Sequence, residues 1–192
     1  MALVALDRQH AGKPGNWTDP GAWYDLDGDG STEVHEAEAR LTRYYMAAAE
    51  DRLVELGHAV VVLSDGTYAE RHNRINAYKA KITVACHLNA GKGLHGLVIH
   101  DSRSVTGQKV AAAMAPKLAA NCPELSKVIV GDTVSYPRAL GCISGLYSGV
   151  GCGIVFEPCF VDQAAHVKLL TPEGLRRIGL GLAEGIHAAL GG

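Results

Sequence analysis

Short apolar runs alternate along the chain with longer segments in which apolar residues recur at helical spacing. The apolar runs predict six strands, at residues 3–7, 58–65, 81–90, 93–102, 127–134 and 151–161. The longer segments predict four helices, at residues 38–56, 67–80, 106–122 and 171–190. Gly57 follows the first helix as a helix-ending residue.

Strands that alternate with helices predict an α/β fold. The predicted strands are apolar almost throughout, as expected when helices cover both faces of a sheet. A length of 192 residues suits one core, and the sequence contains no internal repeat or linker. We therefore expect a single-domain α/β/α layered fold over residues 1–192, with a twisted, mostly parallel sheet of about six strands.

Composition and charge exclude several classes of protein. With 47% hydrophobic and 20% charged residues the chain has the balance of a globular domain. A formal net charge of −2 gives no reason to expect nucleic acid as a partner. No apolar run is long enough for membrane insertion. The oligomeric state stays open, with a monomer favoured.

The N-terminus and the cysteines indicate a protein made in the cytoplasm. MALVALDRQHAG is apolar but short and lacks a basic region, which favours a first strand over a signal peptide. The five cysteines include no C-x-x-C pair. They are interpreted as small buried residues in a reducing compartment, and neither a disulfide framework nor a cysteine zinc cage is predicted.

Three polar residues stand at or near the ends of predicted strands. His10 follows the first strand, His87 ends KITVACH, and Glu157 lies between apolar neighbours in the last strand. Ligands of α/β sheets collect beyond the carboxyl ends of the strands. A lone histidine there is more often structural than functional, whereas a carboxylate in an apolar strand costs about 2 kcal/mol or more unless it is paired or neutralised. Glu157 is therefore the strongest candidate of the three.

A second carboxylate, Glu38, lies on the apolar face of the first predicted helix. It precedes Leu41 by three residues and Tyr45 by seven, so the three share a face. Glu36 is expected on the opposite, outward face. Two histidines with two such carboxylates suggest a catalytic zinc site, in which three side chains hold the metal and the fourth acts as acid or base. The metalloprotease motif H-E-x-x-H is absent.

The acidic stretch before this helix has the pattern of a calcium-binding loop. DLDGDGSTEVHE matches D-x-D-x-D-G-x5-E in full. The predicted Ca²⁺ ligands are Asp25, Asp27, Asp29, Ser31 and Glu36, with Glu33 in the water-mediated position. Two features differ from such loops, because position eight is Thr32 and the preceding segment does not predict a helix. A solvated acidic turn that caps the helix is the alternative.

Four landmarks together resemble the zinc-dependent N-acetylmuramoyl-L-alanine amidases of bacterial autolysins and phage endolysins. LDRQHAG resembles the family's LDxGHGG turn, and Glu38 starts a helix that leads to GHAVVVLSD, similar to GxxVxxTR. RHNRINAYKAKITVACHLNAG resembles RxxxAN followed by HxNA, and CGIVFEPCFVDQ resembles PavLvExGFxxN. Arg138–Gly141 resembles the RxxGL that precedes the last landmark. The landmarks run in family order from residue 3 to about residue 170.

The chain departs from the family pattern at three places. Arg8 and Gln9 replace the usual PG before His10. LSD replaces LTR after the second strand, and Pro158 follows Glu157 where a small or apolar residue is usual.

The resemblance implies a site and a reaction. Zinc would be bound by His10, Glu38 and His87, and Glu157 would be the catalytic carboxylate. The substrate would be the peptidoglycan amide between N-acetylmuramic acid and L-alanine of the stem peptide. Asn89 and Arg138 are implied as substrate contacts. Without a signal peptide or a further binding domain in the sequence, a phage or prophage endolysin that reaches the cell wall during host lysis is favoured.

Two other functions stay open from the residues. One is a different zinc hydrolase of cell-wall peptides on the same scaffold. The other is a non-catalytic, calcium-stabilised wall-binding module whose zinc site has decayed, although the presence of all four polar landmarks argues against decay.

Overall fold

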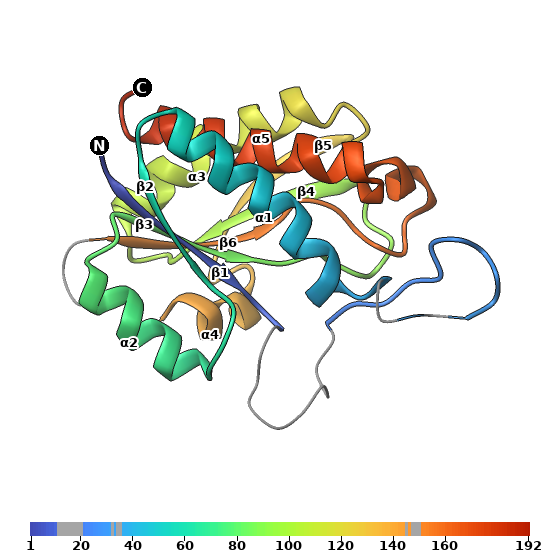
Figure 1. Ribbon diagram of the computed structural model, residues 1–192, viewed down its shortest axis with the longest axis horizontal. Helices are drawn as coiled ribbons and strands as arrows, with labels where there is room; N and C mark the ends of the chain where they lie inside the picture. Colours follow the sequence, from blue (N-terminus) through green and yellow to red (C-terminus); the bar gives the residue numbers. More distant parts are fainter. Residues whose placement is uncertain (11–20, 32, 34–35, 145, 147–150) are drawn as a thin grey trace.

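A single twisted sheet of six strands forms the centre of the computed structural model, which describes residues 1–10, 21–31, 33, 36–144, 146 and 151–192 (Figure 1). The strands are β1 (Leu3–Arg8), β2 (Ala59–Leu63), β3 (Ile82–Cys86), β4 (His95–His100), β5 (Lys127–Asp132) and β6 (Cys152–Glu157). Their order in the sheet is β2-β1-β3-β6-β4-β5. All neighbours are parallel except β4 and β6, so the predicted mostly parallel sheet is confirmed.

Helices cover both faces of the sheet, as the layered prediction requires (Figure 1). The helices are α1 (Glu38–Glu55), α2 (Tyr68–Tyr78), α3 (Val105–Asn121), α4 (Leu140–Ile143) and α5 (Pro172–Ala189), with 3-10 turns η2 (Pro137–Ala139) and η3 (Ala164–Leu170). Residues of α1, α3 and α5 form the larger core cluster on one face, and residues of α2 and α4 pack on the other. The sequence did not predict α4, η2 or η3, because each is too short to show a helical period. No helix in the described ranges is long and apolar enough to cross a membrane.

Five strands end earlier than predicted, and the ends of two of them, β3 and β6, matter for the site. The third predicted strand extends to residue 90, but β3 ends at Cys86; the sixth extends to residue 161, but β6 ends at Glu157. The register pairs Cys86 with Arg8 of β1 and with Phe156 of β6. The residues that follow β1 and β3, together with the last residue of β6, therefore meet at one edge of the sheet.

Tyr45 connects the larger core cluster to this edge of the sheet. Tyr45 is fully buried in α1 and packs edge-on against Phe156 of β6, with ring centroids 5.9 Å apart. Its hydroxyl donates a hydrogen bond of 2.9 Å to the carbonyl of His87. Gly179 of α5 lets α1 approach closely, because a Cβ at that position would collide with the Tyr45 carbonyl. The core thus determines where α1 lies relative to β3.

Candidate metal centre

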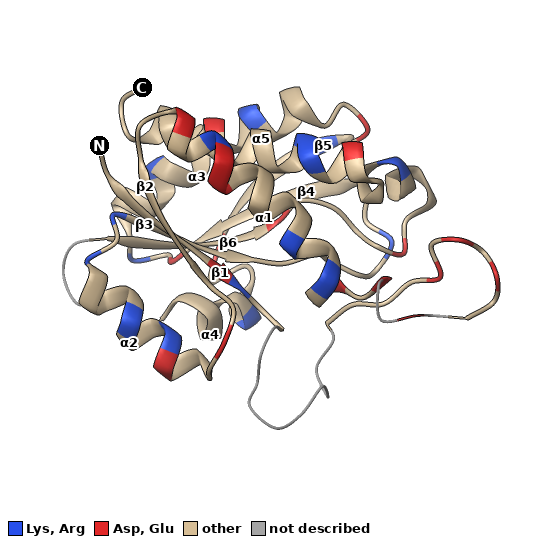
Figure 2. Cartoon of the chain, viewed as in Figure 1, with Lys and Arg blue, Asp and Glu red and all other residues tan. Residues whose placement is uncertain are grey.

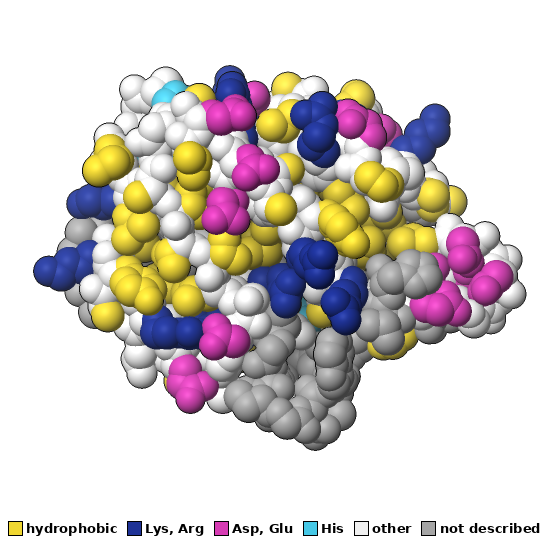
Figure 3. All heavy atoms as spheres, viewed as in Figure 1, with side chains coloured by type: hydrophobic (Ala, Val, Ile, Leu, Met, Phe, Trp, Pro, Cys, Tyr) yellow, Lys and Arg dark blue, Asp and Glu magenta, His cyan; other side chains and the backbone are white. Residues whose placement is uncertain are grey.

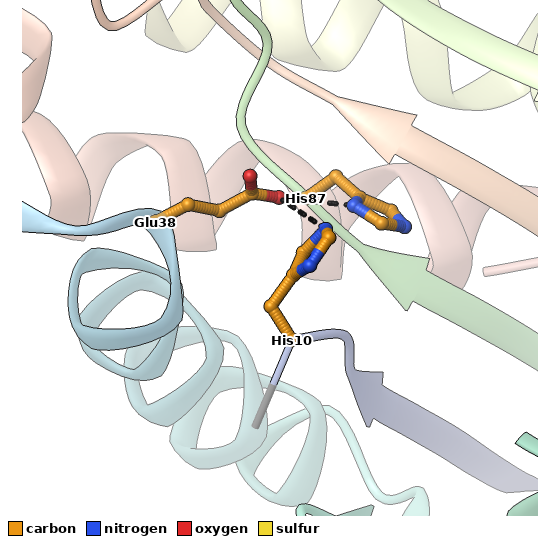
Figure 4. A group of neighbouring side chains, drawn as sticks. All are labelled: His10, Glu38 and His87. Atoms are coloured by element: carbon orange, nitrogen blue, oxygen red, sulfur yellow. Dashed lines mark hydrogen bonds and ion pairs between the residues drawn. The ribbon is translucent and has the colours of Figure 1, made fainter. Parts of the chain in front are cut away.

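His10, Glu38 and His87 converge at the carboxyl edge of β1 and β3 (Figure 4). Oε1 of Glu38 lies 2.9 Å from Nδ1 of His87 and 3.6 Å from Nε2 of His10. The two imidazole rings meet edge to face, with centroids 5.1 Å apart. Glu38 is only 2% exposed, so the inward orientation expected from the helix phase is confirmed.

This donor set fits a zinc ion. One atom from each of the three side chains lies within 4.8 Å of the other two. Ligands at about 2.0–2.1 Å in a tetrahedral shell are about 3.4 Å apart, close to the 2.9 Å and 3.6 Å separations of the carboxylate from the two imidazoles. Two imidazoles with one carboxylate are also a known ligand set of catalytic zinc sites.

Backbone groups hold the Glu38 carboxylate in place. Oε2 accepts a hydrogen bond of 2.8 Å from the Ala22 N–H, and Oε1 accepts one of 2.9 Å from the Leu88 N–H. Gly21, with φ +77°, packs against the same side chain, because a Cβ there would lie 2.8 Å from the Glu38 Cβ. The carboxylate is thus oriented before any cation arrives.

The backbone conformation of His10 and the charge near His87 also suit a cation site. His10 has φ +58°, a left-handed conformation that is uncommon for a residue other than glycine and recurs at functional sites. Burial acts to lower the pKa of His87, but the hydrogen bond with Cys142 and the Glu38 carboxylate raise it to about 10. The negative charge of Glu38 therefore favours positive charge at this point.

Glu157 completes the group from the end of β6. Burial raises the pKa of its carboxyl above the usual range; the charge of His87 opposes this rise and that of Glu38 adds to it. The side-chain amide of Asn89 donates a hydrogen bond of 2.5 Å to Oε2 of Glu157. Asn89 is itself fixed by its backbone N–H, which donates to the Cys159 carbonyl at 2.9 Å.

The two predicted substrate contacts lie in different places. Asn89 contacts Glu157, so its described role is to orient that carboxylate, and its contact with substrate stays a prediction. Arg138 is exposed in η2, just before α4, and its contact with substrate also stays a prediction.

Sequence reasoning missed Cys142, which it grouped with the small buried residues. Sγ of Cys142 lies 3.6 Å from Nε2 of His87, on the opposite side of the ring from Glu38. The carbonyl of Cys142 is in turn 3.0 Å from Nε2 of His72 in α2. A ligand histidine is generally oriented through its second ring nitrogen, and here a thiol occupies that position. No motif spacing could have found it, since α4 brings Cys142 to the site.

A buried ion pair beneath the site was also missed. Asp7 and Arg71 are 1% and 3% exposed, and Oδ1 of Asp7 lies 2.7 Å from Nε of Arg71. Gln9 donates a hydrogen bond of 2.5 Å to the other oxygen of Asp7. Burial raises the pKa of Asp7, while the charges of Arg71, His72 and His87 lower it. The pair fixes the chain immediately before His10 to α2.

The acidic loop corrects one sequence expectation. Glu36 precedes α1 and is fully buried, so it does not point outward from the helix as predicted. Its carboxylate accepts hydrogen bonds from the backbone N–H groups of Leu26, at 2.6 Å, and Glu33, at 2.8 Å, which replace its hydration. The bond from Glu33 is the largest cause that lowers the pKa of Glu36.

The carboxylates of the acidic loop cluster as the calcium pattern predicts (Figure 2). One group consists of Asp25, Asp27 and Glu36, and another of Asp27, Asp29 and Glu33. Asp25 also accepts hydrogen bonds from the N–H groups of Gly28 and Gly30, at 2.7 Å and 2.9 Å. The Ser31 hydroxyl donates to Asp29 at 2.9 Å. Exposed acidic groups can cluster without an ion, and position Thr32 lies outside the described residues, so calcium stays a prediction.

Comparison with known proteins identifies the fold. No family model and no curated protein matches the sequence. Among solved structures, Cwp6 from Clostridium difficile superposes with a TM-score of 0.76 at 20% identity, over 98% of this chain and 29% of that one. The catalytic domain of CwlV, an N-acetylmuramoyl-L-alanine amidase from Bacillus (Paenibacillus) polymyxa var. colistinus, superposes with a TM-score of 0.75 at 18% identity, over 100% and 99% of the two chains.

The chain thus has the fold of the CwlV amidase domain. The catalytic domain of the CD27L endolysin, which targets Clostridia difficile, shares it with a TM-score of 0.62 at 17% identity, over 97% of each chain. The family resemblance of the four landmarks and the similarity in three dimensions thus agree. This chain spans less than a third of Cwp6.

We predict that Arg71→Ala destabilises the protein by about 3–5 kcal/mol, because it leaves the buried Asp7 carboxylate without its cation. Chemical denaturation measures the free energy of unfolding. Arg74→Ala is the matched control on α2, since its partner Asp65 is 75% exposed, and exposed pairs contribute about 1 kcal/mol or less. Asp7→Asn in the Arg71→Ala protein should recover part of the loss. Equal effects of Arg71→Ala and Arg74→Ala would contradict the prediction.

Proposed function

We propose that the protein is a zinc-dependent peptidoglycan amidase. It hydrolyses the amide between N-acetylmuramic acid and L-alanine of the stem peptide. The observation that carries this proposal is the convergence of His10, Glu38 and His87, with Glu157 beside them, on the fold of known amidases.

His10, Glu38 and His87 would hold the zinc ion through two imidazole nitrogens and a carboxylate oxygen. Three protein ligands leave one position of a tetrahedral shell for substrate or water. A bound zinc ion supplies Lewis acidity, which polarises a carbonyl and makes water more acidic. The chain's own contribution is to orient the ligands: backbone N–H groups fix Glu38, and Cys142 lies against the far nitrogen of His87.

Glu157 acts as the general base and then the general acid. Asn89 occupies Oε2, so we assign proton transfer to Oε1. This oxygen takes a proton from the attacking water and returns it to the leaving amine of L-alanine. A carboxyl group with a pKa raised by burial suits both steps, because it can accept a proton and hold it until the amine leaves.

A second zinc hydrolase reaction, on other amides of cell-wall peptides, is distinguished by its products. Digestion of purified peptidoglycan by the zinc-loaded protein should release new free amino groups on L-alanine. New amino groups on other residues instead would favour the peptidase. Binding of the wall without any cleavage would favour the non-catalytic module.

We also propose that the amidase serves as a phage or prophage lysin that reaches the wall after the membrane is opened. The likeness of the fold to the catalytic domain of the CD27L endolysin supports this role. Expression of the protein inside cells, with and without membrane permeabilisation, tests it, with lysis expected only after permeabilisation.

Replacement of any one of His10, Glu38 and His87 by alanine should remove zinc and activity together, because a three-ligand site loses most of its affinity with one ligand. Elemental analysis of purified protein measures the zinc. Glu36→Ala is the matched control, since it removes a buried carboxylate two residues from Glu38 that faces the acidic loop. Loss of zinc from Glu36→Ala but not from Glu38→Ala would show that the ligands are misassigned.

Glu157→Gln should keep zinc and lose activity by about 10²–10⁴-fold, the usual contribution of an acid or base group. Glutamine keeps the shape of the side chain but cannot accept the proton. Activity on peptidoglycan and zinc content are measured on the same preparation. Near-normal activity, or loss of the metal, would refute the assigned role.

Calcium in the acidic loop is tested through stability. An ion that binds only the folded state at a hundredfold excess over its Kd adds about 2.7 kcal/mol, and each kcal/mol raises Tm by about 2–4 °C in a domain of this size. Calcium should therefore raise Tm of protein first stripped of it. The double variant Asp27→Ala, Asp29→Ala should lose this response and keep its zinc. Identical melting curves with and without calcium would leave the loop as a solvated helix cap.

A further inference from the structure

Three arginines gather beside the candidate metal centre. Arg8 is the last residue of β1, two residues before His10. Arg40 and Arg43 follow Glu38 in the first turns of α1 and, three residues apart, share one side of the helix. Figure 2 shows basic residues on the first turns of α1, and Figure 3 shows basic side chains gathered on the same face of the molecule. We call Arg8, Arg40 and Arg43 the arginine cluster.

The alternation of β1 brings Arg8 to the α1 side of the sheet. Val4 and Leu6 belong to the core cluster that contains Tyr45 of α1. Arg8 is in phase with them, because side chains two residues apart leave the same face of a strand. Asp7, out of phase, leaves the opposite face and pairs with Arg71 of α2.

The positive charges of Arg40 and Arg43 act on Arg8. Burial lowers the pKa of Arg8, and the positive charges of Arg43 and Arg40 lower it further. Nε of Arg8 is buried without a hydrogen-bond partner within the part of the chain that the structure describes. Unlike Arg8, six arginines of the described residues form ion pairs with carboxylates, namely Arg52, Arg71, Arg74, Arg103, Arg176 and Arg177.

Such an arrangement is costly unless an anion joins it. Like charges repel, and a buried polar group without a partner costs free energy. The planar guanidinium group matches a carboxylate in a two-pronged geometry. A cluster that lies next to the site of hydrolysis is thus suited to an anionic group of the substrate.

We propose that the arginine cluster binds a free carboxylate of the stem peptide and makes the enzyme selective for the anionic form of its substrate. This inference rests on the proposed amidase function. Arg8 lies two residues before His10 and Arg40 two residues after Glu38, so the cluster lies on the α1 side of the candidate metal centre. The group that it recognises is the α-carboxylate of the γ-linked glutamate that follows L-alanine, which a carboxamide replaces in amidated walls.

The test compares two muramoyl peptides that differ only in this group, carboxylate or carboxamide. The zinc-loaded wild-type protein should show a kcat/KM about tenfold to hundredfold higher for the carboxylate, the range expected for charge-assisted hydrogen bonds. The difference should lie mainly in KM, because the group is remote from the reacting atoms and is bound equally in the ground and transition states.

Arg8→Gln and Arg43→Gln should each reduce the ratio of the two kcat/KM values toward one, with zinc content unchanged. Arg43 is exposed, so its variant tests the idea even if Arg8→Gln fails to fold. Arg52→Gln is the matched control, since Arg52 lies near the end of α1 and pairs with Glu55 at 2.9 Å. It should keep the wild-type ratio.

The outcomes separate this inference from the proposed function. Cleavage of both peptides by the wild-type protein with a ratio of one would overturn the inference and leave the amidase intact. A ratio that Arg8→Gln and Arg43→Gln both preserve would overturn it too. Variants that are impaired on whole walls but not on either peptide would assign the cluster to wall-polymer phosphates instead. Cleavage of neither peptide nor peptidoglycan at the lactyl amide would overturn the amidase itself.

Discussion

The buried carboxylate of Glu38 is the constraint on which the site depends. Its oxygens accept hydrogen bonds from the N–H groups of Ala22 and Leu88 and lie near His10 and His87. These contacts join α1 to segments that precede it and to the end of β3. A buried carboxylate must have such partners, because an isolated charge away from water is very costly. The same requirement makes the site a ready acceptor for a cation.

The strand before His10 links the site to both helical layers. Asp7 leaves one face of β1 and forms the buried pair with Arg71 of α2. Arg8 leaves the other face, toward the arginines of α1. The two adjacent residues thus have different roles. Asp7 fixes β1 to α2, and Arg8 contributes positive charge to the arginine cluster. The departure from the family pattern at Arg8 falls where a substrate contact can change without loss of the metal ligands.

Different residues determine the fold and the proposed chemistry of this protein. Solved structures, the amidase domain of CwlV among them, share the fold at 20% identity or less, so similar packing preserves the architecture in very different sequences. The four polar groups at the sheet edge carry the proposed reaction. The arginine cluster, the Cys142 thiol and the acidic loop lie outside this set of four groups, so substitutions there can change substrate range or stability and keep the metal ligands.

The sequence by itself determined the layered α/β class, the main helices and the inward face of Glu38, because periodicity reports local geometry and burial. It also identified His10, His87 and Glu157 through their positions near strand ends. Only the tertiary structure decided that β4 and β5 run opposite to the other strands, that Glu36 is buried, that Cys142 reaches the site, and that Arg71 pairs with Asp7 beneath it. These depend on contacts between segments far apart in the chain, which no local pattern encodes.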